Sequence, residues 1–377
     1  MARGGIDPVN FSRRKFLQTT GTTLLVSRAP LLSSQAPPVP SIAPMVKEFP
    51  GISQVSLVQG DDRRKNVSAA LEAIDDQLLP KLRQKKYVVI KPNNVNTVNQ
   101  LASTHADALR GIVEYLAPRF RGPIVIAESS AGDTLQAYEN FHYTRLPGEY
   151  RDQKISLVDL NREQKFEAIP LIDFDLHVTP VRLAARLLDP DALVICSAVM
   201  KTHNAVVATL SVKNLTLGAP LHNPPGEKSW SDKRKFHVGV RQNHYNMLLT
   251  AQKLQPNWGA TVIDGYEGME GDGPNSGTPV PSRIAIASTD YIAADRVGVE
   301  AMSIDPSWLG YLVYCGQVGL GNYDLKKIRI QGAALEAVRR KYRLHADIDR
   351  ELQWMGPMED LPPKLGLRQN GESKIYG

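Results

Sequence analysis

The strongest constraint on the fold is an alternation of short β-branched runs with segments of helical periodicity. Apolar runs recur at residues 55–58, 87–90, 124–127, 155–158, 192–196, 260–263 and 284–287. Between them, apolar side chains repeat at intervals of three and four, as in Val67, Leu71, Ile74 and Leu78 and in Ala108, Ile112, Val113 and Leu116. This alternation predicts an α/β fold with a mainly parallel sheet covered by helices on both faces.

The other segments divide the chain into four predicted parts. Residues 1–36 are predicted to be a signal peptide, 37–48 a proline-rich linker, 49–335 the α/β domain and 336–377 a C-terminal tail that packs over the domain without supplying chemistry. A long stretch at about 218–240 is rich in proline, glycine and charge. Because irregular segments of this length are usually functional or mobile, we expect a lid or a surface insertion there.

The N-terminus closely matches the twin-arginine export motif in Ser12-Arg13-Arg14-Lys15-Phe16-Leu17. The mildly apolar stretch that follows, as far as Val26, is shorter and more polar than the roughly 20 apolar residues of a transmembrane helix. We therefore predict export by the twin-arginine (Tat) machinery to the periplasm or another extracytoplasmic compartment, with no stable transmembrane segment. The alternative is a basic, disordered arm. Small residues at both 27–29 and 34–36 leave the cleavage site open.

Charge and cysteine content exclude several classes of function. The net charge is +6, but residues 1–29 contribute five basic residues and one acid, which leaves +2 on the rest. Without a basic stripe, the body is not expected to bind nucleic acid. The two cysteines, Cys196 and Cys315, are too few for an iron–sulfur cluster or a zinc site built on cysteine. Whether they pair stays open, as does the oligomeric state.

Polar side chains follow four of the predicted strands, at the ends where open α/β sheets bind ligands. Loops are polar in any α/β protein, but four separate segments that reach one edge favour a shared small-molecule site. We expect Lys91, Glu128, His203 and Asp264 to open onto one cleft and to pair across it. The candidate ligand-binding residues are Lys91, Asn93, Asn94, Glu128, Ser129 and Asn214.

The segment from residue 200 to 218 supplies the candidate catalytic groups Lys201, His203 and Lys213. A lysine held by apolar neighbours can bind an anion, or act as a base when desolvation lowers its pKa. His203 is the candidate proton carrier. Two alternatives stay open, namely a surface position for Lys213 with its stem on apolar neighbours and a hydrogen-bonded core position for His203.

An acidic, glycine-rich run extends from Asp264 to Gly277. It predicts a loop in which Asp264, Glu267 and Glu270 hold a divalent cation such as Mg²⁺ or Ca²⁺. The run matches neither an EF-hand nor a phosphate-binding P-loop. No Gly-x-Gly-x-x-Gly opens a helix after the early strands, which disfavours a nucleotide-binding oxidoreductase.

In the order of its motifs the chain resembles the uncharacterised DUF362 family over about residues 50–335. The motifs are Lys91-Pro92-Asn93-Asn94, Lys201-Thr202-His203, Lys213-Asn214 with Gly218, and Asp264-Gly265 followed by Glu270-Gly271-Asp272-Gly273-Pro274. Some relatives carry a ferredoxin-like iron–sulfur module, for which this chain lacks the cysteines. The resemblance implies no reaction.

Two functions are therefore expected from the sequence. The first is an exported enzyme that acts on a small anionic substrate by acid/base or metal-assisted chemistry. Isomerase, lyase and hydrolase reactions are not distinguished. The second is a non-catalytic binding protein for a small anion or a metal ion, which needs complementary charge but no shifted pKa values.

Overall fold

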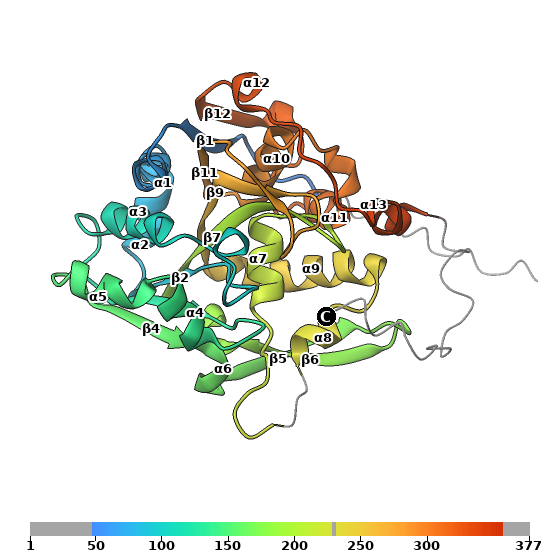
Figure 1. Cartoon of the computed structure of the whole chain (residues 1–377), viewed down its shortest axis with the longest axis horizontal. Coiled ribbons are helices and arrows are strands. Elements are labelled where there is room, and N and C mark those ends of the chain that lie inside the picture. Colours follow the sequence, from blue (N-terminus) through green and yellow to red (C-terminus); the bar gives the residue numbers. More distant parts are fainter. Residues whose placement is uncertain (1–46, 228–230, 357–377) are drawn as a thin grey trace, which may run out of the picture. The chain divides into compact units, whose positions relative to one another are not determined.

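The computed structural model describes residues 47–227 and 231–356 (Figure 1). The predicted signal peptide, nearly all of the linker and the end of the tail lie outside these residues. The strands are β1 (Ser53–Gln59), β2 (Tyr87–Lys91), β3 (Ile124–Glu128), β4 (Ile155–Asp159), β5 (Phe166–Ile172), β6 (Val178–Ala184), β7 (Ala192–His203), β8 (Val207–Thr209), β9 (Trp258–Glu270), β10 (Thr278–Val280), β11 (Ile284–Ser288) and β12 (Ile328–Gly332). The α-helices are α1 (Arg63–Glu72), α2 (Asp75–Leu82), α3 (Ala106–Leu116), α4 (Thr134–Asn140), α5 (Leu146–Glu149), α6 (Leu160–Glu163), α7 (Ser211–Gly218), α8 (Asp232–Phe236), α9 (Val240–Leu254), α10 (Tyr291–Ala301), α11 (Gly310–Gln317), α12 (Leu335–Val338) and α13 (Ile348–Glu351).

One large sheet organises the domain, with strands in the order β12-β1-β11-β9-β7-β2-β3-β4. Strand β11 runs antiparallel to both of its neighbours, and every other adjacent pair along this path is parallel. The short strands β8 and β10 pair with the C-terminal ends of β7 and β9. All seven predicted strand segments lie within these strands, so the prediction of a mainly parallel α/β sheet is confirmed.

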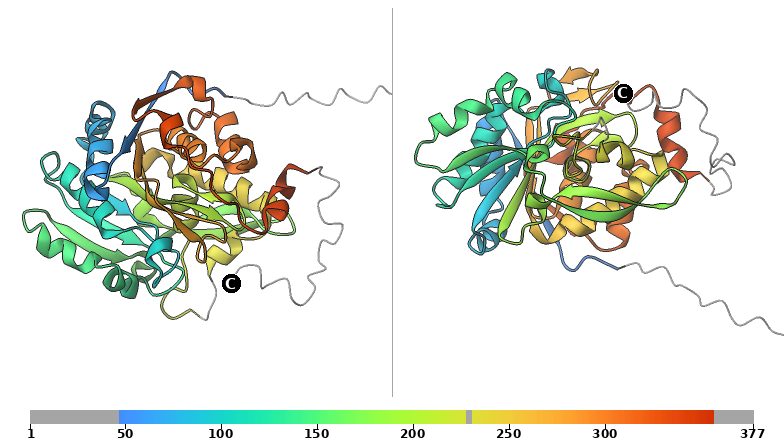
Figure 2. Two further views of the ribbon diagram at one scale, coloured as in Figure 1. Left: turned by 45° about the horizontal axis from the view of Figure 1, so that its top comes forward. Right: turned by 90° about the horizontal axis from the view of Figure 1, so that it is seen from below.

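Helices cover both faces of this sheet (Figure 2). Helices α1, α2 and α3 pack on one face, where Leu71 and Ile112 meet side chains such as Ile90 of β2. Helices α7, α9, α10 and α11 and the β5–β6 ribbon pack on the other face, which includes Val89. Since successive residues of a strand face opposite sides, a strand buried on both sides has a continuous apolar sequence. Burial on both faces therefore explains the unbroken Val-Val-Ile run of β2.

Local sequence signals set the ends of the helices. Asp62 caps α1 by accepting a hydrogen bond from the Lys65 amide at 3.1 Å, and Asp290 caps α10 in the same way. The periodicity over 67–78 belongs to two helices, α1 and α2, rather than to one. Helix α3 lies so close to α1 that a Cβ at Gly111 would be 2.5 Å from the Arg64 carbonyl oxygen.

The connections of β2 create the position for a ligand site. From β2 the chain passes to β3 and β4 on one side, and β7 lies on the other side of β2. Open α/β sheets bind ligands at such a switch point, beyond the carboxyl ends of the strands. Strand β7 extends past its neighbours there, because Lys91 pairs with Cys196 while β7 continues to His203.

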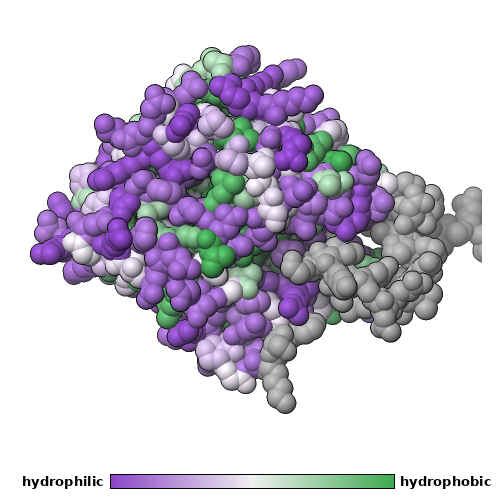
Figure 3. Space-filling view, viewed as in Figure 1, coloured by the Kyte–Doolittle hydropathy of each residue, from purple (hydrophilic) through white to green (hydrophobic). Residues whose placement is uncertain are grey.

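The surface viewed in Figure 3 is largely hydrophilic, and apolar side chains form only small groups on it. The described part of the tail contributes Val338 and Tyr342 to the core. Cys196 and Cys315 are both buried and are not joined by a disulfide. A search of the described residues finds no helix that is long and apolar enough to cross a membrane.

Candidate functional site: a cationic pocket at the ends of the strands

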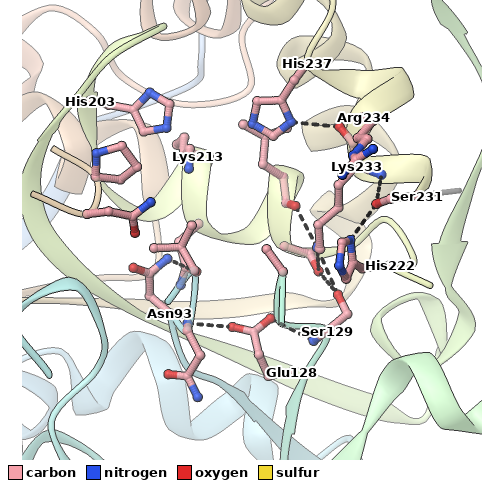
Figure 4. Close-up of a pocket in the computed structure, with 18 of the residues that line it drawn as sticks. Asn93, Glu128, Ser129, His203, Lys213, His222, Ser231, Lys233, Arg234 and His237 are labelled. Carbon is pink, nitrogen blue, oxygen red and sulfur yellow. Dashed lines mark hydrogen bonds between the residues drawn. The ribbon is translucent and has the colours of Figure 1, made fainter. Parts of the chain in front are cut away.

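A pocket of about 350 Å³ lies beyond the carboxyl ends of β2, β3 and β7 (Figure 4). Four basic side chains and three histidines line it, together with a single carboxylate. Segments far apart in sequence contribute most of the lining: Lys91 at the end of β2 with Asn93 and Asn94 after it, Glu128 at the end of β3 with Ser129 after it, His203 of β7, Lys213, Asn214 and Gly218 of α7, His222, Ser231, Lys233, Arg234 and His237 around α8, and Pro274 and Asn275 after β9.

Lys91 and Glu128 form a buried ion pair in the wall of the pocket. The ammonium and carboxylate are 2.9 Å apart, and the side chains are 1% and 2% exposed. Lys91 Nζ also donates to Asn214 Oδ1 at 2.9 Å and to the carbonyl of the next residue at 2.8 Å. Glu128 further accepts from the Asn94 amide at 3.0 Å. The hydrogen-bonding capacity of Lys91 is therefore used within the protein, and the pair shapes the pocket.

Close packing around this ion pair explains why α7 has a glycine at position 218 and an asparagine at position 214. A Cβ at Gly218 would lie 2.1 Å from Lys91 Nζ, so any larger residue would displace the ammonium. Asn214 Oδ1 accepts from Asn93 Nδ2 at 2.9 Å as well as from Lys91, and its Nδ2 donates to the Ser197 carbonyl at 3.2 Å. Asn214 thus joins α7 to β2 and β7.

Lys213, in the first turn of α7, differs from the other lysines of the pocket. Its side chain is 4% exposed, and no residue in 47–227 or 231–356 forms a hydrogen bond or an ion pair with its ammonium. Burial and, to a lesser extent, the charge of Lys91 lower the pKa of Lys213 to about 7. A large share of Lys213 is therefore a neutral amine near pH 7, and a neutral amine is a base and a nucleophile.

His203 lies beside Lys213, whose charge is the largest electrostatic contribution to the lowered pKa of His203 after burial. The Ala205 amide donates to His203 Nδ1 at 3.0 Å, so the neutral ring carries its proton on Nε2. Burial lowers the pKa of His203 well below its usual value. The neutral His203 is therefore a hydrogen-bond donor through Nε2, while the backbone amide occupies Nδ1.

The described parts of the stretch at 218–240, residues 218–227 and 231–240, form one wall of the pocket. Asp232 of α8 ties it to β6 through an ion pair with Arg182 at 2.5 Å. Lys233 Nζ donates to Ser129 Oγ at 3.1 Å and to the carbonyls of Leu217 and Gly218 at 3.0 and 3.1 Å. Burial lowers the pKa of Lys233 to about 7, although its hydrogen bonds favour the ammonium. Lys233 therefore fixes α8 over the ends of β3 and α7.

Arg234 and two histidines complete this wall. Arg234 is exposed at the pocket, and burial lowers the pKa of both His222 and His237 to about 4. His222 Nδ1 lies 2.7 Å from Ser231 Oγ. None of these residues is among the site residues expected from the sequence. The signal that points to Arg234 and His237 is the run Lys233-Arg234-Lys235 followed by His237, which places four basic or imidazole side chains within one short segment.

Three side-chain atoms at the pocket lack hydrogen-bond partners among the described residues, namely Asn93 Oδ1, Asn94 Nδ2 and Asn275 Oδ1. Asn93 and Asn94 are 5% and 1% exposed. Buried polar atoms normally form hydrogen bonds, so an unpaired acceptor and an unpaired donor at a pocket are suited to a polar ligand.

Lys201, Asp264, Glu267 and Glu270 are absent from the pocket lining. Lys201 is fully buried beside the pocket, and its ammonium donates to the Ala102 carbonyl and, at 3.5 Å, to the Pro274 carbonyl. Lys91, Glu128 and His203 do share one pocket. The expectation that Asp264 joins them is wrong, because Asp264 lies within β9 and pairs with Arg63 at 3.2 Å.

The prediction of a loop that begins at Asp264 is also wrong, since β9 continues to Glu270 and pairs there with β10. Along a strand, six residues span about 20 Å, so Asp264 and Glu270 are too far apart to share one ion. Glu267 is exposed, and Glu270 accepts from the Arg343 amide at 2.8 Å. Within the described ranges, no group of three His, Cys, Asp or Glu side chains could hold a metal ion. The cation stays a prediction from the sequence.

These features define an α/β protein with a cationic pocket at the switch point of a mainly parallel sheet. Residues 88–300 match the model of DUF362, described as a domain of unknown function. The chain belongs to this family.

Two individual proteins are also similar to the chain. A thylakoid-associated protein from Synechocystis sp. is 29% identical over 143 residues, which are 37% of this chain and 41% of that protein. The chain thus matches less than half of the length of this relative. A solved structure of a Thermotoga maritima protein aligns with a TM-score of 0.39 and 8% identity, over 62% of this chain and 57% of that one.

Proposed function

We propose that the pocket binds a small anion and that the protein is an enzyme acting on it by acid/base chemistry. The observation that carries the proposal is the imbalance of charge in the pocket. Lys91, Lys213, Lys233 and Arg234 line it, while Glu128 is the one carboxylate among its lining residues. Because Glu128 is already paired with Lys91, the charge of Arg234 and of the protonated fraction of Lys213 is available to a ligand.

Acid/base chemistry is supported by the buried groups beside this charge. Catalytic sites commonly hold ionisable groups whose pKa values are shifted by desolvation. Lys213 has a pKa of about 7, which suits a general base near neutral pH. His203 offers a neutral Nε2–H that can donate to an oxygen on which negative charge develops. In this proposal Lys213 moves the proton and His203 stabilises the oxygen.

Calorimetric titration tests anion binding. Oxalate is the probe, oxamide is its uncharged analogue, and the variants are Arg234→Gln and Lys213→Met. We expect oxalate alone to bind, and each variant to weaken it by about tenfold, the effect of losing one charge-assisted contact. The control is Arg83→Gln, on an exposed residue outside the pocket. Equal binding of oxamide, or unchanged affinity in both pocket variants, would refute the proposal.

A non-catalytic binding protein is the second candidate, favoured by the unpaired Asn93 Oδ1 and Asn94 Nδ2, which suit recognition without reaction. The two candidates differ in turnover. Proton NMR in D₂O follows exchange of C–H groups next to the carbonyl or carboxylate of added small acids. An enzyme with an acid/base lysine exchanges them, and Lys213→Met abolishes the exchange. Binding without any exchange would favour the binding protein.

We also propose, from the sequence, export by the Tat machinery and, separately, a divalent cation bound at one of the carboxylates Asp264, Glu267 and Glu270, which do not converge on a single ion. An ion at Asp264 would have to displace Arg63. If it binds, Mg²⁺, Ca²⁺, Mn²⁺ or Zn²⁺ raises the melting temperature with the logarithm of its concentration. The double variant Asp264→Asn with Glu270→Gln then loses this rise. Melting curves that no ion changes would remove the cation.

A further inference from the structure

The amine of Lys213 stands apart chemically from the other amines near the pocket. Lys91 and Lys233 each make three hydrogen bonds within the protein, and Lys201 lies outside the pocket lining. Lys213 lines the pocket, is nearly buried and has no partner among the described residues. A lysine in such a place is free to attack a ligand that enters the pocket.

We propose that Lys213 is a covalent site, at which its amine forms an imine with the carbonyl carbon of a small 2-oxo acid. This inference rests on the proposed anion site and names its class of ligand. The nitrogen lone pair adds to the carbonyl carbon and gives a carbinolamine. The C–O bond then breaks, the C=N bond forms, and the oxygen leaves as water with the two protons of the amine. No oxidant, reductant or metal is needed.

The lining of the pocket supplies what this step requires. The oxygen that leaves needs a hydrogen-bond donor, and the Nε2–H of His203 is beside Lys213. The ligand carboxylate needs a cation, and Arg234 lies at the same pocket. The unpaired Nδ2 of Asn94 can donate to a carboxylate oxygen of the acid, and the unpaired Oδ1 of Asn93 can accept from the hydroxyl of the carbinolamine. A neutral aldehyde would use fewer of these groups.

The protonation of Lys213 makes the reaction dependent on pH. With a pKa of about 7, the neutral fraction of the amine rises from about one tenth at pH 6 to about nine tenths at pH 8. The rate of imine formation should rise about tenfold over this range. The charged and titratable groups that interact with Lys213 from the surrounding elements are Lys91, Glu128, Lys201, His203, Lys233 and His237.

Reductive trapping tests the proposal. The full chain is incubated with glyoxylate, pyruvate or 2-oxoglutarate and sodium borohydride, and intact mass and peptide mapping locate the product. We expect one added group, on Lys213, from at least one of these acids and at least tenfold less labelling by propanal at equal concentration. Labelling spread over surface lysines, or no labelling of Lys213 by any of the acids, would overturn the proposal.

Variants separate the imine from simple anion binding. Lys213→Arg keeps a cation and Lys213→Met keeps the side-chain length, and both should lose the trapped product. Lys65→Arg, on an 84% exposed side chain, should label as the wild type does. If either Lys213 variant fails to fold, the wild-type peptide map still decides. Calorimetric binding of the acids without trapping would overturn the imine and leave the anion site intact, and absence of both would overturn both.

Discussion

The side chain of Lys213 should cost the protein stability at low pH. Its pKa falls from an ordinary value of 10.5 to about 7 on folding, because burial penalises the ammonium. Between these values the unfolded chain binds more protons than the folded one, so stability rises with pH across this window. Below pH 7 the full penalty is present, about 3–5 kcal/mol for a shift of this size.

Lys213→Met removes this penalty. We expect the variant to be more stable than the wild type by a few kcal/mol at pH 6, with a gain that shrinks as the pH rises towards 10. Urea unfolding at pH 6, 8 and 9.5 measures it. Lys65→Met, on the exposed lysine of α1, should change stability by less than about 0.5 kcal/mol at each pH. A Met variant that is less stable at pH 6 than at pH 9.5, relative to the wild type, would contradict the account.

At the scale of single residues, the sequence predicted which side chains follow the strands but not how deep they lie. Lys91, Glu128, His203 and Lys213 were all expected at one site and do line one pocket. Lys201 and His203 lie two residues apart in β7. Because β7 extends beyond its neighbours, Lys201 is buried between other segments and donates to the Ala102 carbonyl. Depth depends on strand register, which no local pattern reveals.

At the scale of elements, the β7–β8 hairpin that carries His203 is held by the C-terminal part of the chain. Glu351 of α13 is fully buried, and its carboxylate accepts from the Val207 amide at 2.6 Å. Val207 has a φ of +68°, which is unfavourable for a β-branched residue. Arg350 donates to the Asn204 carbonyl at 3.0 Å. These contacts stabilise the turn that places the His203 ring at the pocket.

Glu351→Ala should loosen this turn. The Val207 amide would lose its acceptor while still largely buried, at a cost of about 1–3 kcal/mol. Urea unfolding measures the loss, and calorimetry with oxalate should show weaker binding because His203 is no longer held. The control is Asp349→Ala, an exposed acid of the same helix. If both variants match the wild type in stability and affinity, α13 does not support the site.

The elements themselves were predictable to different degrees. Strands buried on both faces, such as β2 and β3, have continuous apolar runs that identify them. The end of β9 was misjudged, because its alternating glycines and acids resemble a loop, while pairing with β7 and β10 keeps it extended. The wall built by α8 was expected only as a lid or a surface insertion, since its position depends on the ion pair between Asp232 and Arg182.

At the scale of the whole molecule, the predicted targeting signal lies in residues that the structure does not describe, so export stays a prediction. Replacing Arg13 and Arg14 by lysine should keep the precursor in the cytoplasm, because the paired arginines are what the Tat machinery reads. Cell fractionation and immunoblotting measure this, with Arg28→Lys as the control in the same segment. Mature protein in the periplasm of cells that express the double variant would argue for another route.

The central claim is that one small anion binds at the carboxyl ends of β2, β3 and β7. A crystal structure of the protein grown with saturating oxalate tests it most directly, since oxalate has two carboxylates and no ketone that could react with an amine. The account predicts a single oxalate in the pocket, within hydrogen-bond distance of Lys213 and contacted by His203, Arg234 or the side-chain amide of Asn94. Ordered water alone in the pocket, or oxalate bound only elsewhere, would contradict it.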